Sequence, residues 1–197
     1  MSHNQGVKPG LGYIDRAITR GVVATIPAWR WVGASPNGLT TLSLVTSALC
    51  VYFTYTRWAA PAIVFLFLRT YFDYADGILA RRYDMATRFG DLYDHINDIT
   101  FNTALFMVLV IGKWKSTGLK IGMLTTLSIA LLLLMIQLGC IEAAFYRNQK
   151  IEKETSISWL RHACPQFAVP ILNAFDSGTF NLVFAATIVA FSASRPP

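Results

Sequence analysis

The chain has 197 residues, of which 54% are hydrophobic and 14% charged, and its mean hydropathy is +0.44. This balance excludes an ordinary soluble domain, in which about a quarter of the residues are charged, and favours a helical membrane protein. The net charge of +6 lies mostly between apolar stretches, so the lipid bilayer is the expected partner and nucleic acid is not.

The first predicted element is an amphipathic helix over residues 13–33, which carries three arginines among aliphatic residues. A helix with one basic face and one apolar face lies in the membrane interface. Pro27 should bend or end this helix. The first twelve residues are polar, so no cleavable signal peptide is expected. The predicted domains are an N-terminal arm with the interfacial helix over 1–36 and a membrane domain over 37–197.

Six apolar stretches follow, each close to the ~20 residues that a helix needs to cross a bilayer. The predicted fold class is therefore all-α, a polytopic integral membrane protein with six transmembrane helices. A charged connector over 147–156 precedes the fifth stretch, which two prolines and an arginine interrupt. The expected spans are 37–57, 61–81, 88–112, 119–145, 157–175 and 179–193.

The basic residues between the spans predict the orientation, because cytoplasmic loops carry an excess of Lys and Arg. Eleven fall on the side of the N-terminus and four on the other side, so the N-terminus and the candidate active site should face the cytoplasm. The eleven are Lys8, Arg16, Arg20, Arg30, Arg81, Arg82, Arg88, Arg147, Lys150, Lys153 and Arg195, and the four are Arg57, Lys113, Lys115 and Lys120.

The three cysteines lie in apolar surroundings without a CxxC spacing. Cys50, Cys140 and Cys164 are therefore predicted to be small buried hydrophobic residues, without a metal or a disulfide.

Six of the eleven acidic residues fall within 26 positions: Asp73, Asp76, Asp84, Asp91, Asp94 and Asp98. A carboxylate at mid-bilayer costs roughly 2.5–3.5 kcal/mol, so this cluster predicts a compensating divalent metal ion. At about 100° per residue, the acids and neighbouring small residues fall on one face of each of two helices that can confront each other. The two faces comprise Asp73, Asp76, Gly77 and Ala80 in one helix, and Gly90, Asp91, Asp94 and Asp98 in the other.

Arg81 lies one step off the first acidic face, where its guanidinium can meet an anion. Gly77, Ala80 and Gly90 leave room beside the acids. A metal site, an anion site and an open cleft together indicate chemistry on a phosphate ester. Asp91 is either a partner of the ligands or a solvated charge, and His95 is expected to pack at the interface.

The segment reads Asp73-x2-Asp76-Gly77-x2-Ala80-Arg81-x8-Gly90-x3-Asp94-x3-Asp98 and resembles the signature of the CDP-alcohol phosphotransferase family at every fixed position and gap. The run Ser35-Pro36-Asn37-Gly38-Leu39-Thr40 is similar to the P-N-x-L-T run that opens the first span in these enzymes.

The resemblance implies a metal-dependent enzyme of phospholipid synthesis, which transfers a substituted phosphate from a CDP-alcohol to a second alcohol and releases CMP. Its metal ligands would be Asp73, Asp76, Asp94 and Asp98, and Mg²⁺ or Mn²⁺ is expected because these ligands are hard oxygens. Asp98 would also be the general base for the attacking hydroxyl. A homodimer is implied too. The expected CDP-alcohol contacts are Asp73, Gly77, Ala80, Arg81, Gly90, Asn37 and Thr40.

The sequence leaves the substrates open. The short length favours CDP-diacylglycerol with a small polar acceptor such as inositol, glycerol phosphate or serine. The pattern Asp94-His95-x2-Asp98 instead resembles choline and ethanolamine phosphotransferases, which use CDP-choline or CDP-ethanolamine with diacylglycerol. A third interpretation is a non-enzymatic divalent-cation transporter, whose acids should lie at mid-span rather than near helix ends.

Overall fold

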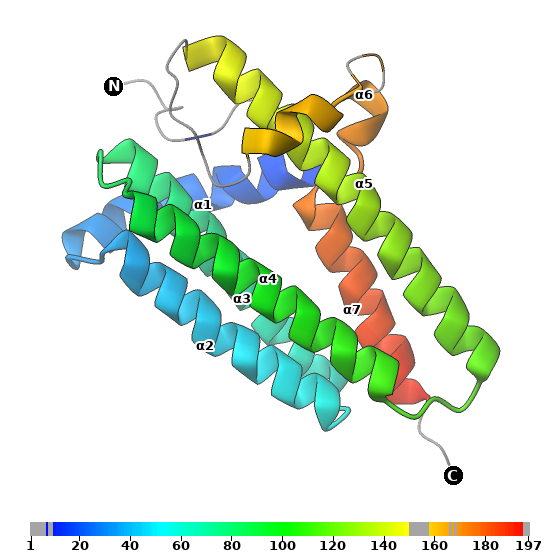
Figure 1. Ribbon diagram of the computed structural model, residues 1–197. Coiled ribbons are helices and arrows are strands. Elements are labelled where there is room, and N and C mark those ends of the chain that lie inside the picture. The colour runs from blue at the N-terminus through cyan, green and yellow to red at the C-terminus, as the bar shows by residue number, and fades with distance from the viewer. Residues whose placement is uncertain (1–6, 8–9, 150–157, 166, 168, 195–197) are drawn as a thin grey trace.

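The computed structural model describes residues 7, 10–149, 158–165, 167 and 169–194, and in this part the chain forms only helices and their connections. Five long helices form a bundle, and α1 lies across one end of it (Figure 1). In chain order the elements are α1 (Tyr13–Trp31), α2 (Pro36–Tyr55), α3 (Ala59–Arg82), α4 (Arg88–Ile111), α5 (Thr117–Gln149), the 3-10 helix η1 (Ser158–Ala163), α6 (Val169–Leu172) and α7 (Ser177–Ala193).

The amphipathic helix predicted at 13–33 is present as α1, which buries Val22, Val23 and Ile26 on its apolar face. Pro27 lies inside α1, and the helix continues beyond it to Trp31. The prediction was that Pro27 bends or ends the helix, and the second of these outcomes was therefore wrong. The four helical residues after Pro27 lead directly into the turn that precedes α2.

Side-chain caps fix where α2 and α4 begin. The Ser35 hydroxyl accepts a hydrogen bond from the Gly38 amide at 3.1 Å, and Pro36 fills the first helical position, where no backbone donor is needed. The Thr87 hydroxyl accepts from the Gly90 amide at 3.0 Å in the same way. These two caps place the starts of the helices that carry Asn37, Thr40 and the second half of the acidic motif.

A pair of buried carboxylates joins the start of α1 to the start of α7. Asp176 accepts hydrogen bonds from the amides of Ile14 and Asp15 at 2.8 and 2.9 Å, and from the Thr179 amide at 2.9 Å. Asp15 in turn accepts from the Gly178 amide at 2.7 Å. Burial and the neighbouring charge of Asp176 raise the pKa of Asp15 above its usual range. Both carboxylates lie at the positive, amino-terminal ends of helices, Asp176 at those of α1 and α7 and Asp15 at that of α7.

Small polar residues line the face of α2 that packs against α3. Thr40, Ser43, Ser47, Cys50 and Thr54 are all buried and alternate in spacing between three and four residues. Small side chains allow close approach of membrane helices, and their hydroxyls supply hydrogen bonds across the contact. This face therefore brings polar groups to the motif-bearing helix α3.

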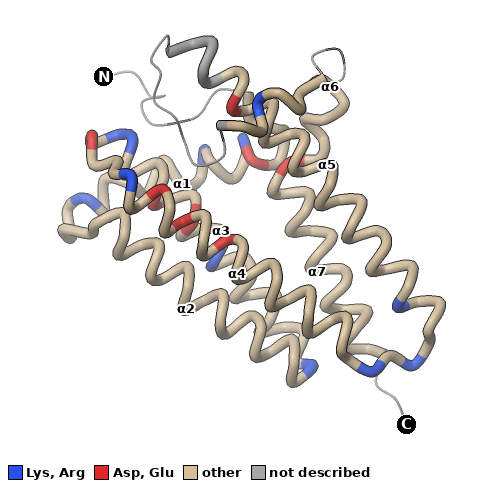
Figure 2. Tube along the Cα trace, viewed as in Figure 1, with Lys and Arg blue, Asp and Glu red and all other residues tan. Residues whose placement is uncertain are grey.

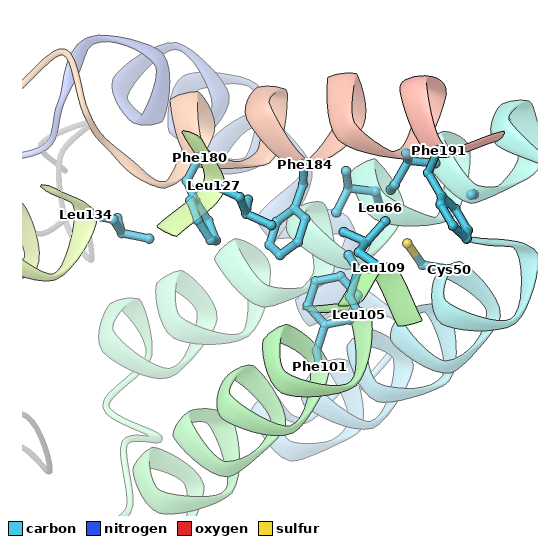
Figure 3. Packing of buried hydrophobic residues seen from close by; sticks show 12 residues of the cluster. Cys50, Leu66, Phe101, Leu105, Leu109, Leu127, Leu134, Phe180, Phe184 and Phe191 are labelled. Carbon is cyan, nitrogen blue, oxygen red and sulfur yellow. The ribbon is translucent and has the colours of Figure 1, made fainter. Parts of the chain in front are cut away.

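The larger of two apolar clusters lies between α3, α4, α5 and α7, with Cys50 of α2 at its edge (Figure 3). Phe180 and Phe184 of α7 contact each other with their ring centroids 4.8 Å apart, and Phe184 lies 6.3 Å from Phe101 of α4. Leu66 of α3 and Leu105 of α4 are fully buried in the same cluster. This core holds α3 and α4 in a fixed relation to each other through α7.

Two helices are long and apolar enough to cross a membrane, Pro36–Tyr55 and Thr117–Ala144, and Ser177–Ala193 is a shorter apolar helix. The helices α3 and α4 each have 24 residues, but they carry the charged motif, which lowers their hydropathy. These features, with the overall composition, indicate a membrane protein.

The fifth predicted span, 157–175, was wrong. Its described part contains only η1 and the four-residue helix α6, which spans about 6 Å at 1.5 Å per residue. Pro165 and Pro170 lack the backbone donors that a continuous helix needs. Most of the predicted connector 147–156 lies outside the described residues, although α5 continues to Gln149.

A disulfide joins Cys140 of α5 to Cys164, which follows η1. The prediction that all three cysteines are simple buried hydrophobic residues was therefore wrong for this pair and was confirmed only for Cys50. The bond fastens the η1 segment to α5. Cys140 and Cys164 are 24 residues apart in the sequence, so no local spacing indicated that they pair.

The loss of the fifth span also changes the predicted topology. The end of α7 lies beside the loop between α4 and α5, where the Lys115 amide donates to the Ser194 hydroxyl at 2.7 Å. Arg57, at the end of α2, donates to the Phe191 carbonyl at 2.7 Å. The six-span prediction placed the C-terminal end on the side of the N-terminus, but α7 ends at the opposite end of the bundle. Arg195 lies outside the described residues.

Charges divide between the two ends of the bundle. Among the described residues, the acidic side chains lie toward the end that carries α1, together with arginines, and the other end carries only basic residues (Figure 2). The acidic motif at the junction of α3 and α4 belongs to the first end.

Candidate active site

The two acidic faces meet as the helical spacing predicts. Asp73 of α3 and Asp94 and Asp98 of α4 each offer a carboxylate oxygen, and these oxygens lie within 4.8 Å of one another. All three side chains are partly exposed. Three carboxylates at this distance repel one another unless a cation lies between or beside them.

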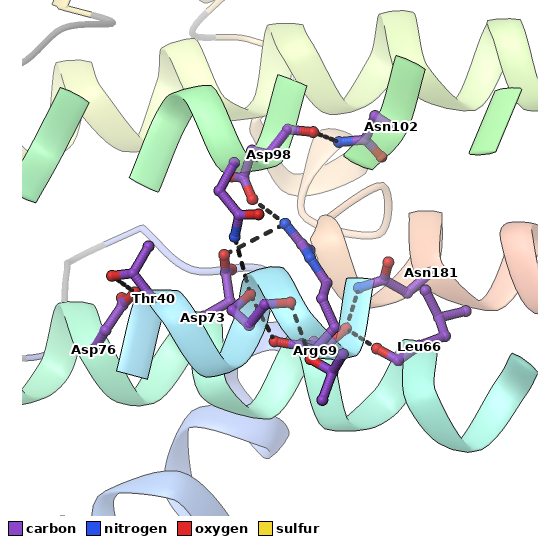
Figure 4. A network of polar contacts seen from close by, with 12 residues as sticks. Thr40, Leu66, Arg69, Asp73, Asp76, Asp98, Asn102 and Asn181 are labelled. Carbon is purple, nitrogen blue, oxygen red and sulfur yellow. Dashed lines mark hydrogen bonds and ion pairs between the residues drawn. The ribbon is translucent and has the colours of Figure 1, made fainter. Parts of the chain in front are cut away.

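Arg69 supplies one such positive charge. It lies one helical turn before Asp73 in α3, and its Nη2 forms ion pairs with the Asp73 carboxylate at 3.4 Å and with the Asp98 carboxylate (Figure 4). Arg69 is only 6% exposed, and its guanidinium carbon lies 4.8 Å from the centroid of the Phe101 ring. A buried arginine therefore connects the two halves of the acidic motif.

Asp76 lies apart from the group formed by Asp73, Asp94 and Asp98. Its side chain is 3% exposed, and its Oδ2 accepts a hydrogen bond from the Thr40 hydroxyl of α2 at 2.6 Å. Thr40 is thus placed at the site, in contact with an acid of the motif.

Gly77 and Arg81 fit together on α3. A Cβ atom at Gly77 would lie 3.0 Å from Nη1 of Arg81, so the guanidinium folds back over this glycine. The Arg81 guanidinium interacts electrostatically with the carboxylates of Asp76, Asp91, Asp94 and Glu142. The arginine of the motif is therefore held among carboxylates of α3, α4 and α5.

Gly90 and Asn37 bring the starts of α4 and α2 close together. A Cβ atom at Gly90 would lie 2.9 Å from Oδ1 of Asn37 and would displace it. Ala80 lies near the end of α3, where its carbonyl accepts a hydrogen bond from the Met85 amide at 2.8 Å. The predicted CDP-alcohol contacts thus come from three helices, α2, α3 and α4.

Two buried polar atoms beside the acids lack a hydrogen-bond partner. They are Nε of Arg69 and Oδ1 of Asn97, a residue 2% exposed whose Nδ2 donates to the Ser43 hydroxyl at 3.1 Å. A buried donor and acceptor left unpaired cost free energy, so such groups mark the place of a ligand or water. The oxygen-only set of carboxylates and these unpaired atoms fit a hydrated Mg²⁺ or Mn²⁺ ion.

Comparison with protein families gives a match to the CDP-alcohol phosphatidyltransferase model over residues 34–193, which is most of the chain and includes every residue of the motif. The chain belongs to the CDP-alcohol phosphatidyltransferase family. No curated protein matches it. Members of the CDP-alcohol phosphatidyltransferase family are transferases of substituted phosphate groups in phospholipid biosynthesis. Membership excludes the non-enzymatic transporter as an account of this chain.

The sequence prediction missed two charged residues of the site. Arg69 was a lone arginine in an apolar stretch, one turn before Asp73, and Glu142 is a 4% exposed acid in the long apolar stretch of α5. An ionisable residue inside a membrane helix is a signal of function in its own right. That signal, applied to each apolar stretch, would have found both residues. His95 contacts its own helix, with Nδ1 2.6 Å from the Asp91 carbonyl.

Proposed function

We propose that this protein transfers a phosphatidyl group from CDP-diacylglycerol to the hydroxyl of a small polar acceptor, such as inositol, glycerol phosphate or serine, and releases CMP. The observation that carries the proposal is the meeting of Asp73, Asp94 and Asp98 from two helices at the family motif. The position of these acids near one end of the bundle allows a lipid-linked donor to reach them from the membrane.

Asp73, Asp94 and Asp98, with Asp76, would hold Mg²⁺ or Mn²⁺. A bound divalent ion would supply Lewis-acid stabilisation of the charge that develops on the pyrophosphate. Asp76 would reach this ion with the carboxylate that Thr40 already orients by its hydrogen bond. An amide or hydroxyl donor that fixes a ligating carboxylate is a common feature of metal sites.

Asp98 would accept the proton of the acceptor hydroxyl as that oxygen attacks the phosphorus atom. The new bond joins the acceptor oxygen to phosphorus, and the bond from phosphorus to the CMP oxygen breaks. Arg81 would contact a phosphate through its planar fork of donors. Gly77, Ala80, Gly90, Asn37 and Thr40 would shape the donor pocket around that phosphate.

A second candidate is transfer of phosphocholine or phosphoethanolamine from the CDP-alcohol to diacylglycerol. The observation that favours it is the Asp94-His95-x2-Asp98 pattern. The His95 Nδ1 atom contacts Asp91 of its own helix, 2.6 Å from the carbonyl and 3.7 Å from the carboxylate. We favour the phosphatidyl transfer because the compact chain resembles the enzymes that use CDP-diacylglycerol.

The proposed membrane arrangement is multi-pass, with α2, α3, α4, α5 and α7 as spans, the motif at the cytoplasmic end and a homodimer as the assembly. Basic residues on the side of α1 support this orientation. Single cysteines at Asp84 and Ser116, in a chain with Cys50 replaced, should label from opposite sides of the membrane. Labelling of both from one side would contradict the arrangement.

The test of the reaction is release of CMP by purified protein with Mg²⁺ or Mn²⁺. We expect CMP release from CDP-diacylglycerol with one of the small polar acceptors. Release only from CDP-choline or CDP-ethanolamine with diacylglycerol would establish the second candidate. Release from none of these donors, by protein that remains helical, would contradict both.

A further inference from the structure

Arg69 occupies a place in the site that the family motif does not include. The motif begins at Asp73, and Arg69 lies one turn before it on the same face of α3. Its guanidinium forms ion pairs with a carboxylate on each of the two motif helices, Asp73 of α3 and Asp98 of α4.

The ion pairs use only part of each carboxylate. Both contacts go to the Oδ1 atom, which leaves Oδ2 of Asp73 and Oδ2 of Asp98 for another partner. A carboxylate that is held by one oxygen has lost most of its rotational freedom. The second oxygen is then positioned before any ion arrives, which lowers the entropic cost of binding.

Arg69 is itself fixed in place. It is 6% exposed, and its guanidinium packs on the Phe101 ring in the interior of the bundle. Its backbone carbonyl accepts a long hydrogen bond of 3.4 Å from Ser43, and Ser43 in turn accepts from Asn97. Because these contacts fix Arg69, its guanidinium can orient the carboxylates that it binds, which a mobile surface arginine cannot do.

The site also offers two buried polar atoms to a further ligand. Arg69 Nε and Asn97 Oδ1 are buried next to the acids and have no hydrogen-bond partner. Buried polar groups are normally satisfied, so these two atoms favour a bound partner at this place. This second observation is independent of the acidic cluster, and it points to a water or ligand group bound beside the ion.

We propose that Arg69 is a positioning residue for the divalent ion, which fixes one oxygen of Asp73 and of Asp98 so that their other oxygens bind the ion. The inference rests on the metal site of the proposed function. The opposite role would be competition, in which Arg69 occupies the place of the ion and weakens its binding.

The test is Mn²⁺ binding to the purified full-length protein, measured by calorimetry and by the loss of the signal of free Mn²⁺ in electron paramagnetic resonance. We expect Arg69→Gln to weaken Mn²⁺ binding about 10- to 100-fold, the usual cost of removing a partner of a metal ligand. Arg69→Lys keeps the charge but not the planar fork, so its loss should be smaller but still measurable. Wild-type or tighter binding by either variant would overturn the proposal.

Arg57 provides a matched control at the other end of the bundle. Like Arg69 on Phe101, Arg57 packs its guanidinium on a phenylalanine ring, 3.9 Å from the centroid of Phe191, and it donates to the Phe191 carbonyl. Arg57→Gln should therefore cost stability as Arg69→Gln does, but leave Mn²⁺ binding at the wild-type value. An equal loss of binding in both variants would show a general effect of stability and would contradict a specific role for Arg69.

The binding assay also separates this inference from the proposed reaction. Weaker Mn²⁺ binding in the Arg69 variants, with no CMP release by the wild-type protein from any donor, would support the positioning role and reject the reaction. If Arg69→Gln does not fold, Arg69→Lys decides the outcome by the same measurement.

Discussion

Two groups of carboxylates lie toward the same end of this bundle, and they are satisfied in different ways. Asp15 and Asp176 are at most 1% exposed and accept hydrogen bonds from backbone amides at the starts of α1 and α7. Asp73, Asp94 and Asp98 are partly exposed and converge on one another, with Arg69 as a shared cation. The first pair is satisfied by amides within the protein, whereas the second group is the proposed metal site.

The comparison teaches that proximity of acids does not identify a metal site. Helix ends supply positive partial charge and amide donors, so a carboxylate pair between two helix starts is a structural joint. Carboxylates that converge from the sides of two helices receive no such donors from the backbone, since the amides within a helix are already bonded. The predictions below test this difference.

The largest expected effect is that of metal removal. Treatment with EDTA should abolish CMP release, and added Mg²⁺ or Mn²⁺ should restore it, because the three converging carboxylates would repel both one another and the anionic donor. The helical content should not change, since Asp15 and Asp176 need no ion. CMP release that persists after EDTA treatment would reject the metal assignment.

The next largest effect is expected for Asp98→Asn, which keeps the shape of the side chain but removes the base. Turnover should fall at least ~10²-fold, the low end for the loss of general-base catalysis. Binding of the CDP-alcohol in the presence of metal should remain. Measurement of affinity and single-turnover rate on one preparation distinguishes the roles, and loss of binding would make Asp98 chiefly a metal ligand.

Much of this site was predictable from the sequence. The spacing of Asp73, Asp94 and Asp98 predicted their meeting because helical periodicity places residues three or four apart on one face. Arg69 and the Cys140–Cys164 bond were not predicted. Arg69 lies outside the family motif, so the spacing of the motif did not indicate it. A disulfide depends on three-dimensional proximity, which no local sequence pattern encodes.

Much of the fold was also predictable from the sequence, with the exception of the fifth span. The bounds of α2, α3 and α4 follow from apolar length and from cap residues such as Ser35 and Thr87. The segment 157–175 has the length of a span, but Pro165 and Pro170 prevent a continuous helix. Length alone therefore overestimated the number of spans.

A smaller effect is expected at the other carboxylate pair. Asp176→Ala removes the caps of α1 and α7 and should lower the free energy of unfolding by about 2 kcal/mol, since each cap contributes roughly 1 kcal/mol. Asp176→Asn keeps an acceptor oxygen and should lose less. Thermal unfolding followed by circular dichroism measures both, and equal stability of the alanine variant and the wild type would contradict the role of Asp176 as a joint.

The smallest effect concerns pH. Because the pKa of Asp15 is raised in the folded state, the folded protein holds this proton to higher pH than the unfolded chain does. The contribution of protonated Asp15 to stability is therefore full below the ordinary carboxyl pKa of about 4 and is lost as the pH rises through the folded pKa. Asp15→Asn should flatten this part of the curve of unfolding midpoint against pH. A curve of unchanged slope would contradict the shift.

The contrast between the two carboxylate groups is tested most directly by Mn²⁺ binding to Asp73→Asn and Asp176→Asn. Both substitutions remove one negative charge at the same end of the bundle, and both keep the shape of the side chain. The wild type and Asp176→Asn should bind Mn²⁺ with equal affinity, and Asp73→Asn should bind at least about tenfold more weakly. Wild-type affinity in Asp73→Asn would show that the converging carboxylates are not the metal site.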